Sequence, residues 1–433
     1  MNAAERDAGL VRGLGTWGLT ASIVSMVVGA GIFAVPSALA AAVGPYAPVA
    51  FLACGVAIGA IAICFAEGGS RMPTSGGAYG YIEASLGAMP GYICGTLLWV
   101  SDALASGGVA AAFADLVASM TPQSLTGLVR PLAMVGLVGT IALVNVCGIR
   151  RGAQLIGAAT AVKLIPLLVF VLVGASAVRG NNLAIHAGAI SPDAGRAVFL
   201  AMFALIGMES SLCASGEVAQ PARTIPRAIA FALITVTLLY LGIQVVAQGI
   251  LGPALATSAS PLADAMGRIS PVLRALMLAG AGLSMLGWMG SDILSTPRML
   301  FAFGRDGFLP RALGRVHPRS RAPYVAILSY AVLVITLALT GTFAELAVLA
   351  TLTMAPLYVL GCFAAWRLAR AGVALAGPPL NFRWLGIAAA VGIAGMLAVL
   401  ALASRAEILG LIALIGISTA VYLLQTRFAP AAA

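Results

Sequence analysis

The sequence has very little charge. Only 9% of its 433 residues are Asp, Glu, Lys or Arg, and its mean hydropathy is +1.05. Soluble globular proteins carry about 25% charged residues, so this composition excludes that class. Lysine is nearly absent, because 23 of the 24 basic residues are arginines and Lys163 is the single exception. A lone lysine inside an apolar stretch is a candidate for a specific role.

Metal-binding and nucleophilic residues are also scarce. The two histidines, His186 and His317, lie beside connecting loops, and the six cysteines lie in apolar stretches without a C-x-x-C pair. Buried thiols usually pack as small apolar side chains, so we expect no metal site, no disulfide and no cofactor. No loop carries a P-loop motif, which argues against ATP-driven transport. With no nucleophile or histidine cluster, we do not expect an enzyme.

Long apolar runs fill the sequence instead. A membrane-spanning helix needs about 20 apolar residues, which leaves room for about twelve spans. The runs lack the period-two alternation of a membrane β-barrel. We therefore expect an all-α membrane protein with twelve transmembrane helices, forming one integral-membrane domain over residues 1–433. The runs are 17–42, 47–66, 91–119, 128–147, 153–178, 196–215, 228–251, 272–300, 323–341, 345–366, 384–403 and 407–425.

The arginines indicate how these spans are oriented. With alternating sides, the loops on the N-terminal face hold 17 arginines and the opposite face holds 6, while Lys163 lies within a span. Basic residues concentrate in cytoplasmic loops, so both termini are predicted to be cytoplasmic. The first run is interpreted as a span and not as a cleaved leader. The net charge of +10 then reflects membrane insertion and contact with anionic lipid, and no nucleic-acid partner is expected.

Two spans contain signals for interrupted helices. The first has VVGAGIFAVP (27–36), with two glycines at a spacing that does not suit G-x-x-x-G helix packing. The sixth has FALIGMES (203–210). Close packing of small residues would account for the first pattern. The alternative is a helix that unwinds in mid-membrane, where backbone groups line a cavity.

Four motifs in order carry a resemblance to a known family. They are GAGIF (29–33), EGGSRMPTSGGAYGYI (67–82), GMES (207–210) and RMLFAFGRDGFLP (298–310). Together they resemble the amino acid–polyamine–organocation superfamily of secondary transporters. The resemblance implies a LeuT-type fold with a five-plus-five inverted repeat, in which helices one and six are broken. The repeats would cover about 17–180 and 195–370, followed by two additional helices over about 384–425.

Four ionisable residues lie deep in predicted spans, where a charge costs at least about 2.5 kcal/mol. Lys163 could be a structural partner of broken-helix carbonyls. In the family it resembles a built-in substitute for sodium, which could also exchange a proton. Glu209 could accept amides freed by the break or act as a protonatable coupling group. Asp102 and Asp292 could face the cavity together and contact a cationic substrate.

The substrate site is expected to consist mostly of main chain. Amides at Ala30 and Gly31 suit an α-carboxylate, because helix N-termini favour anions. Carbonyls at Val27, Phe203 and Ile206 suit an α-ammonium. By resemblance, Phe203 takes the place of an aromatic gate.

A second aromatic of this predicted site is Trp288. In the family's cation antiporters a further aromatic residue lines the side-chain pocket, and this sequence has Asp292 at the corresponding position. The sequence therefore departs from the antiporter pattern there.

These observations predict a secondary active transporter of amino acids in the bacterial inner membrane. It would work by alternating access, as a proton-coupled symporter or as an exchanger, without sodium. The alternative within the family is a polyamine or organic-cation antiporter, which Asp102 and Asp292 would favour. A channel or a membrane-bound enzyme would need a pore motif or a nucleophile cluster, and the sequence has neither.

Overall fold

The computed structural model describes residues 13–72, 77–147, 149–184, 194–213, 215–305, 308–320, 322–375 and 377–428, without the side chains of 123, 149–161 and 426–428. Within these ranges the structure is helical, and its β-structure consists of one isolated parallel bridge between Leu14 and Val218. This bridge ties the start of the described chain to the segment that follows the sixth predicted span. The prediction of an all-helical protein is confirmed for the described residues.

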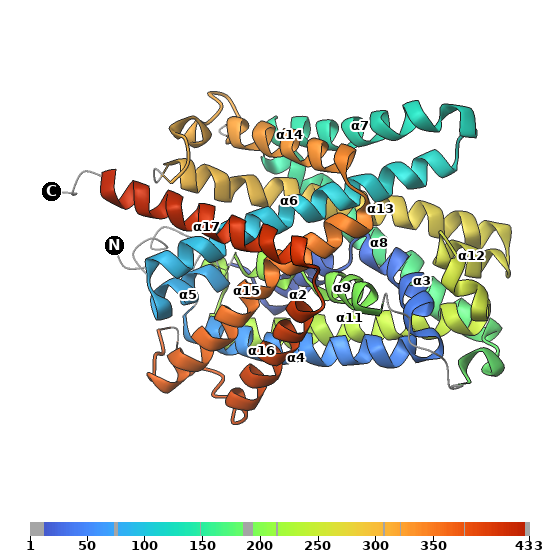
Figure 1. Cartoon of the computed structure of the whole chain (residues 1–433), viewed down its shortest axis with the longest axis horizontal. Helices are drawn as coiled ribbons and strands as arrows, with labels where there is room; N and C mark the ends of the chain where they lie inside the picture. Colours follow the sequence, from blue (N-terminus) through green and yellow to red (C-terminus); the bar gives the residue numbers. More distant parts are fainter. Residues whose placement is uncertain are drawn as a thin grey trace.

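The helices follow the apolar runs closely (Figure 1). The α-helices are α2 (Thr16–Val27), α3 (Gly31–Val43), α4 (Ala47–Arg71), α5 (Ala78–Leu86), α6 (Ala88–Ser119), α7 (Thr126–Val146), α8 (Ile149–Gly174), α9 (Ala194–Leu205), α10 (Met208–Leu212), α11 (Pro221–Leu251), α12 (Pro261–Gly267), α13 (Pro271–Arg305), α14 (Tyr324–Thr340), α15 (Phe343–Arg370), α16 (Leu385–Ala401) and α17 (Arg405–Phe428). Short 3-10 turns are η1 (Gly44–Tyr46), η2 (Gln123–Leu125), η3 (Ala175–Ala177), η4 (Gly180–Leu183), η5 (Ser215–Glu217), η6 (Gly252–Thr257) and η7 (Arg311–Gly314).

Length and hydropathy support a multi-pass membrane protein. In the described part of the chain, eight helical stretches are long and apolar enough to cross a membrane, and four shorter apolar helices accompany them. Two of the twelve predicted runs are each divided between two helices, 17–42 into α2 and α3 and 196–215 into α9 and α10. The number of spans and the five-plus-five repeat stay predictions.

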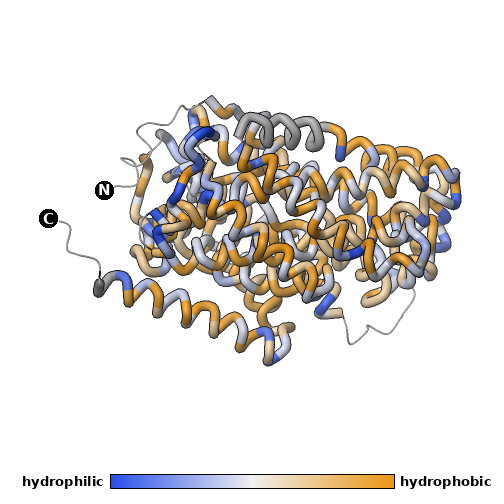
Figure 2. The backbone as a smooth tube through the Cα atoms, turned by 90° about the horizontal axis from the view of Figure 1, so that it is seen from above, coloured by the Kyte–Doolittle hydropathy of each residue, from blue (hydrophilic) through white to orange (hydrophobic). Residues whose placement is uncertain are grey.

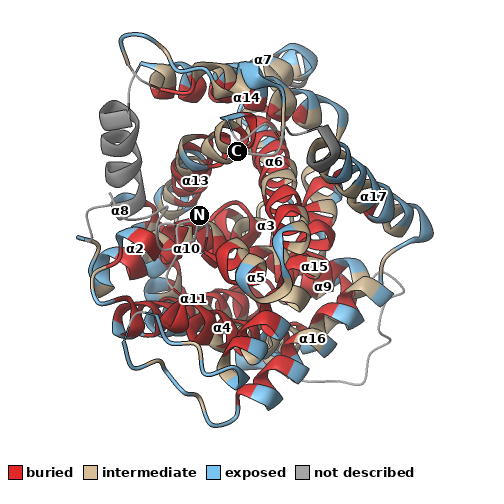
Figure 3. Ribbon diagram, turned by 90° about the vertical axis from the view of Figure 1, so that its left-hand side faces the viewer, coloured by how far each residue is buried: buried red, intermediate tan, exposed pale blue. Residues whose placement is uncertain are grey.

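Burial divides the helices into a central and a peripheral set. Figure 3 shows buried residues concentrated on the central helices, whereas α7, α16 and α17 at the periphery carry many exposed residues. Only 6% of the apolar window in α17 is buried, and its exposed residues include Leu409, Ile412 and Ile417. Such apolar exposure suits helices that face lipid. In Figure 2 hydrophobic residues follow the helices, and hydrophilic residues gather towards their ends.

The two chain ends lie at the same end of the molecule (Figure 1), together with α5 and the segment that joins α13 to α14. The α12 helix lies at the opposite end. We call these the N-terminal face and the distal face.

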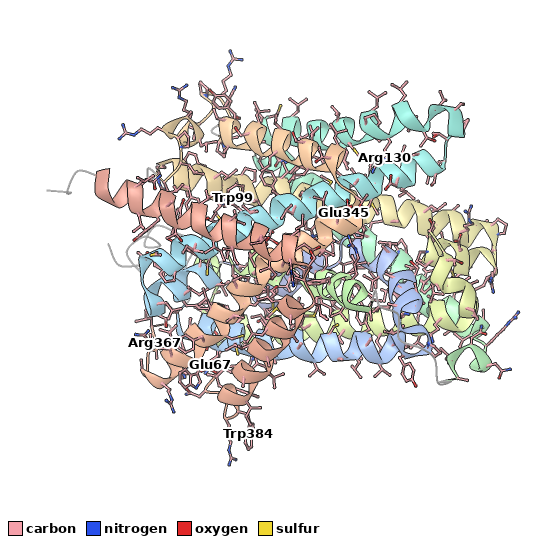
Figure 4. The ribbon with its side chains drawn as sticks, in the orientation of Figure 1. Glu67, Trp99, Arg130, Glu345, Arg367 and Trp384 are labelled. Atoms are coloured by element: carbon pink, nitrogen blue, oxygen red, sulfur yellow. The ribbon has the colours of Figure 1, made fainter. Side chains whose placement is uncertain are left out.

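A buried polar cluster on the N-terminal face joins α4 to the loop between α15 and α16. Arg71 Nε contacts Glu67 Oε1 at 2.7 Å, and its other nitrogens donate to the Val373 carbonyl and to Asn381 Oδ1. The Phe382 amide donates to Glu67 Oε2 at 2.9 Å. Glu67 lies at the same end of the molecule as Arg367, at the end of α15 (Figure 4). We call Glu67, Arg71, Val373, Asn381 and Phe382 the α4 clamp.

Candidate substrate-binding site

The first apolar run is broken in the middle of the molecule. α2 ends at Val27 and α3 begins at Gly31, and Val28 between them has an extended backbone. A helix end leaves carbonyls without partners inside the helix, and such groups are costly when they are buried. The break can therefore persist only if other parts of the chain satisfy these carbonyls.

Side chains from three other helices satisfy five consecutive carbonyls at this break. Lys163 Nζ on α8 donates to Ser25 O at 2.5 Å and Val28 O at 2.8 Å, Trp288 Nε1 on α13 to Met26 O at 2.6 Å, Tyr240 Oη on α11 to Val27 O at 3.2 Å, and Ser284 Oγ on α13 to Gly29 O at 3.3 Å. Because the donors come from separate helices, the break is part of the tertiary packing.

The sixth run is broken at the same depth, and the two breaks touch. Gly207, between α9 and α10, has a φ of 133°, which side-chain-bearing residues rarely adopt. A Cβ there would stand 2.7 Å from Met26 O. A Cβ at Gly31 would stand 3.0 Å from the Ala204 Cα atom. Glycine at both positions lets the two interrupted helices approach to backbone contact.

A small cavity lies between the two breaks. Its wall is formed by α2, α3, α6, α9, α10, α13, α15 and the residues that join the broken halves. Asp102 from α6 and Glu209 from α10 are its two carboxylates. Among the described residues, no basic side chain lines it. The cavity thus combines main-chain groups with acidic side chains.

Glu209 is held in place from two sides. Tyr358 Oη on α15 donates to Glu209 Oε2 at 2.7 Å, and the Gly207 amide donates to the same oxygen at 3.3 Å. Glu209 is only 1% exposed. The carboxylate therefore accepts a main-chain amide at the break and connects α10 to α15.

Asp102 and Asp292 share a hydroxyl group. Thr296 Oγ1 lies 3.0 Å from Asp102 Oδ2 and 2.8 Å from Asp292 Oδ1. Asp292 Oδ2 also contacts Ser106 Oγ at 2.5 Å and Tyr330 Oη at 2.7 Å. We call these five residues the aspartate cluster. It joins α6, α13 and α14 just behind the cavity wall.

Comparison with known proteins identifies the family. Residues 14–405 match the family described as amino acid permease. The chain belongs to the amino acid permease family. The resemblance that the four motifs indicate is thereby confirmed, and the chain is a multi-pass membrane transporter rather than an enzyme.

Two of the relatives of this permease are named for their substrates, and a third is uncharacterised. A methylthioribose transporter of Bacillus subtilis is 25% identical over 344 residues, which cover 75% of this chain and 74% of the relative. A branched-chain amino acid permease of the same organism is 26% identical over 351 residues, with 75% and 74% covered. An uncharacterised transporter of Mycobacterium bovis is 33% identical over 333 residues, with 73% and 71% covered.

The permease brings most of the predicted site residues to one place. Those on the cavity wall are Val27, Ala30, Gly31, Asp102, Phe203, Ile206, Glu209 and Trp288. Lys163 lies behind the first break, on the carbonyls of Ser25 and Val28. Asp292 is fully buried in the aspartate cluster and does not line the cavity, because the hydroxyl groups around it occupy both its oxygens.

The two predicted aromatic residues have different surroundings. The ring of Phe203 packs edge-on against Phe343 at a centroid distance of 5.8 Å. Phe343 lines a second cavity of about 270 Å³ towards the distal face, and Ala30 lines both cavities. Trp288 instead packs against Gly29, where an added Cβ would stand 3.1 Å from the indole ring. Phe203 thus lines the first cavity and contacts a residue of the second, whereas Trp288 packs against the break.

Sequence reasoning did not find the hydroxyl-bearing residues of the site. Tyr240, Ser284, Thr296, Tyr330 and Tyr358 all contact the breaks or the acidic residues. Serine, threonine and tyrosine occur throughout apolar spans, so no pattern distinguishes these five. The signal that could have found them is their position opposite a broken helix, which depends on the tertiary arrangement.

Proposed function

We propose that this permease is a secondary active transporter that moves amino acids across the cytoplasmic membrane by alternating access. It is proton-coupled or works as an exchanger, and it does not need sodium. The observation that carries this proposal is the cavity between two touching helix breaks, which offers main-chain groups and carboxylates. Alternating access is the family's mode of transport, which the resemblance implies, and the two breaks are where the halves of each interrupted helix could move.

The main chain at the breaks suits the two charged groups of an α-amino acid. Ala30 and Gly31 stand at the start of α3, where the first amides have no partner within the helix. These amides and the helix dipole favour a carboxylate. The carbonyls of Val27, Phe203 and Ile206 are the proposed partners of the ammonium. Val27 O already accepts one hydrogen bond from Tyr240 and has a second lone pair for the substrate.

The position of Lys163 supports sodium independence. Its ammonium donates to two carbonyls of the first break, and carbonyl oxygens are also ligands that metal cations accept. Because the Lys163 ammonium already occupies these carbonyl oxygens, they are not free to coordinate a sodium ion. We propose that Lys163 and Glu209 are the coupling residues, with protons as partners.

The alternative is a polyamine or other organic-cation antiporter. The observation that favours it is the presence of Asp102 and Glu209 on the cavity wall, where no basic side chain lies among the described residues. A second cationic group on the substrate would balance this acidic surface. Asp292 would then act on such a substrate through Asp102, since it lies one layer behind the wall.

The proposed membrane arrangement has twelve spans, a LeuT-type five-plus-five repeat and both termini in the cytoplasm. The common location of the chain ends and the breaks in the first and sixth runs support it. The apolar residues exposed on α16 and α17 are the proposed contacts with membrane lipid.

A ligand screen followed by a transport assay tests this function. Purified permease is heated with single amino acids, methylthioribose, putrescine, spermidine and agmatine, and a compound that binds the native state raises the melting temperature. The compounds that bind are then offered to proteoliposomes under a proton gradient or a sodium gradient. Accumulation of an amino acid with the proton gradient, or in exchange for internal amino acid, is expected. Accumulation that requires sodium would contradict the proposal, and binding of polyamines alone would favour the alternative.

A further inference from the structure

The hydrogen bonds of the aspartate cluster need one more proton than its hydroxyl groups supply. Four contacts at hydrogen-bonding distance join the two carboxyl groups to three hydroxyl groups, those of Ser106, Thr296 and Tyr330. Each hydroxyl has one proton to donate. Three hydroxyl protons can fill three of the four contacts. The fourth contact needs a proton on a carboxyl group, because two oxygens facing each other with lone pairs alone would repel.

The contact that lacks a hydroxyl proton is one of the two at Thr296, because among these three hydroxyl groups only that of Thr296 contacts two carboxyl groups. Thr296 donates to one aspartate and must accept from the other. Asp292 is the better acceptor, since Ser106 and Tyr330 already donate to it and hydrogen bonds to a carboxylate favour its charged form. Within the aspartate cluster Asp102 contacts only Thr296; it lines the cavity, where the Ser210 hydroxyl also lies beside its carboxyl group. The donor to Thr296 is therefore Asp102.

We infer that Asp102 carries a proton in the substrate-free permease, while Asp292 is a buried anion that holds that proton in place through Thr296. Two carboxyl groups this close cannot both be ionised without strong repulsion, so they behave as a pair that shares one proton. Asp102 is the member that can exchange with the cavity. Asp292 is a positioning residue, because it acts through Thr296 and does not line the wall.

The other titratable groups around Asp102 agree with this assignment. Glu209 on α10 adds a second carboxylate to the cavity, which opposes ionisation of Asp102. Tyr330 on α14 and Tyr358 on α15 are engaged with Asp292 and Glu209. The Lys163 ammonium on α8 donates to carbonyls of the first break. In the described part of the chain, no arginine or lysine forms an ion pair with either aspartate.

The consequence for transport rests on the proposed function in its organic-cation antiporter form, because a proton leaves the site as a cationic group enters it. When the amine of a substrate approaches as an ammonium ion, Asp102 releases its proton to the water on the open side and pairs with the ammonium as a carboxylate. The net charge of the cavity with bound ammonium then equals that of the empty cavity. This makes Asp102 the residue at which a proton and a cationic group replace each other.

Infrared spectroscopy of the purified permease tests the protonation without any substrate. A protonated carboxyl group absorbs in a carbonyl region that is clear of ionised carboxylates and shifts in D₂O. We expect one such band to be lost in Asp102→Asn, whose amide can donate to Thr296 as the acid does. Asp292→Asn should also remove it, because without the anion Thr296 is free to donate to an ionised Asp102.

Matched variants separate this result from general disruption. Thr296→Ser keeps the hydroxyl and should keep the band, whereas Thr296→Val removes the acceptor and should shift or abolish it. Glu209→Gln should leave the Asp102 band in place, which distinguishes the two carboxyl groups of the cavity. A band that survives in Asp102→Asn and is lost in Asp292→Asn would overturn the assignment. Since no substrate is used, failure of the proposed transport activity would leave this test unaffected.

Discussion

A single methyl group at position 207 tests whether the two breaks must touch. Gly207→Ala places a Cβ against the Met26 carbonyl in a backbone conformation that costs about 1–3 kcal/mol for other residues. We expect a clearly lower melting temperature and loss of uptake. Gly59→Ala is the matched control, because its added Cβ would meet nothing within 4 Å inside helix α4. That variant should melt at or above the wild-type temperature, and equal losses in both variants would contradict the explanation.

Variants at the first break can distinguish a role of Lys163 in transport coupling from a role in supporting the break. Lys163→Ala removes the donor to Ser25 O and Val28 O, and we expect it to abolish uphill uptake in proteoliposomes while some substrate binding remains. Tyr240→Phe is the control, since it removes the donor to the adjacent Val27 carbonyl without removing a charge. It should retain accumulation. Wild-type accumulation by Lys163→Ala would exclude the coupling role.

At the scale of elements, the permease contains a buried and an exposed ion pair that differ in expected strength. The side chains of Arg71 and Glu67 in the α4 clamp are 5% and 0% exposed, whereas those of Arg130 and Asp115 are 33% and 55% exposed. Figure 4 shows Glu67 among the lower helices and Arg130, a residue of α7, in the upper part of the same view. Both pairs have a closest contact of 2.7 Å, so burial is the main difference.

Removing one partner should therefore have unequal effects. Arg71→Ala leaves Glu67 as an unpaired buried charge and should cost about 3–5 kcal/mol. It also releases Val373 and Asn381, so the loop between α15 and α16 should become accessible to protease. Arg130→Ala should cost no more than about 1 kcal/mol. Chemical unfolding in detergent measures both, and a similar loss in the two variants would show that the clamp does not stabilise the loop.

At the scale of the whole molecule, the arginine distribution predicts which face is cytoplasmic. In a variant without the six native cysteines, Arg319→Cys places a thiol on the N-terminal face and Thr257→Cys places one in η6 towards the distal face. Both positions are exposed. A membrane-impermeant thiol reagent should label Thr257→Cys in intact cells and Arg319→Cys only after permeabilisation. The reverse pattern would invert the proposed topology.

The fold could be predicted in outline because its causes are local. Runs such as 128–147 and 407–425 are apolar over the length of a span, and α7 and α17 begin and end within a few residues of those limits. In a membrane, backbone groups must bond within their own segment, so an apolar run of this length has few alternatives to a helix. The breaks were also indicated locally, since glycines in mid-helix are unfavourable unless the helix is interrupted.

Composition and pattern determined that this protein is a helical membrane protein and where its helices are interrupted, since apolar length and glycine placement act within one segment. The resemblance carried by four motifs indicated that it is a transporter. Which side chains meet was decided only by the tertiary structure. Lys163 and Val28 are 135 positions apart, and Ser106 and Asp292 are 186 apart. Glu209 lies on the cavity and Asp292 behind it, although both are acidic residues in mid-span. Nothing in the sequence separates them, because the difference comes from hydroxyl groups on other helices.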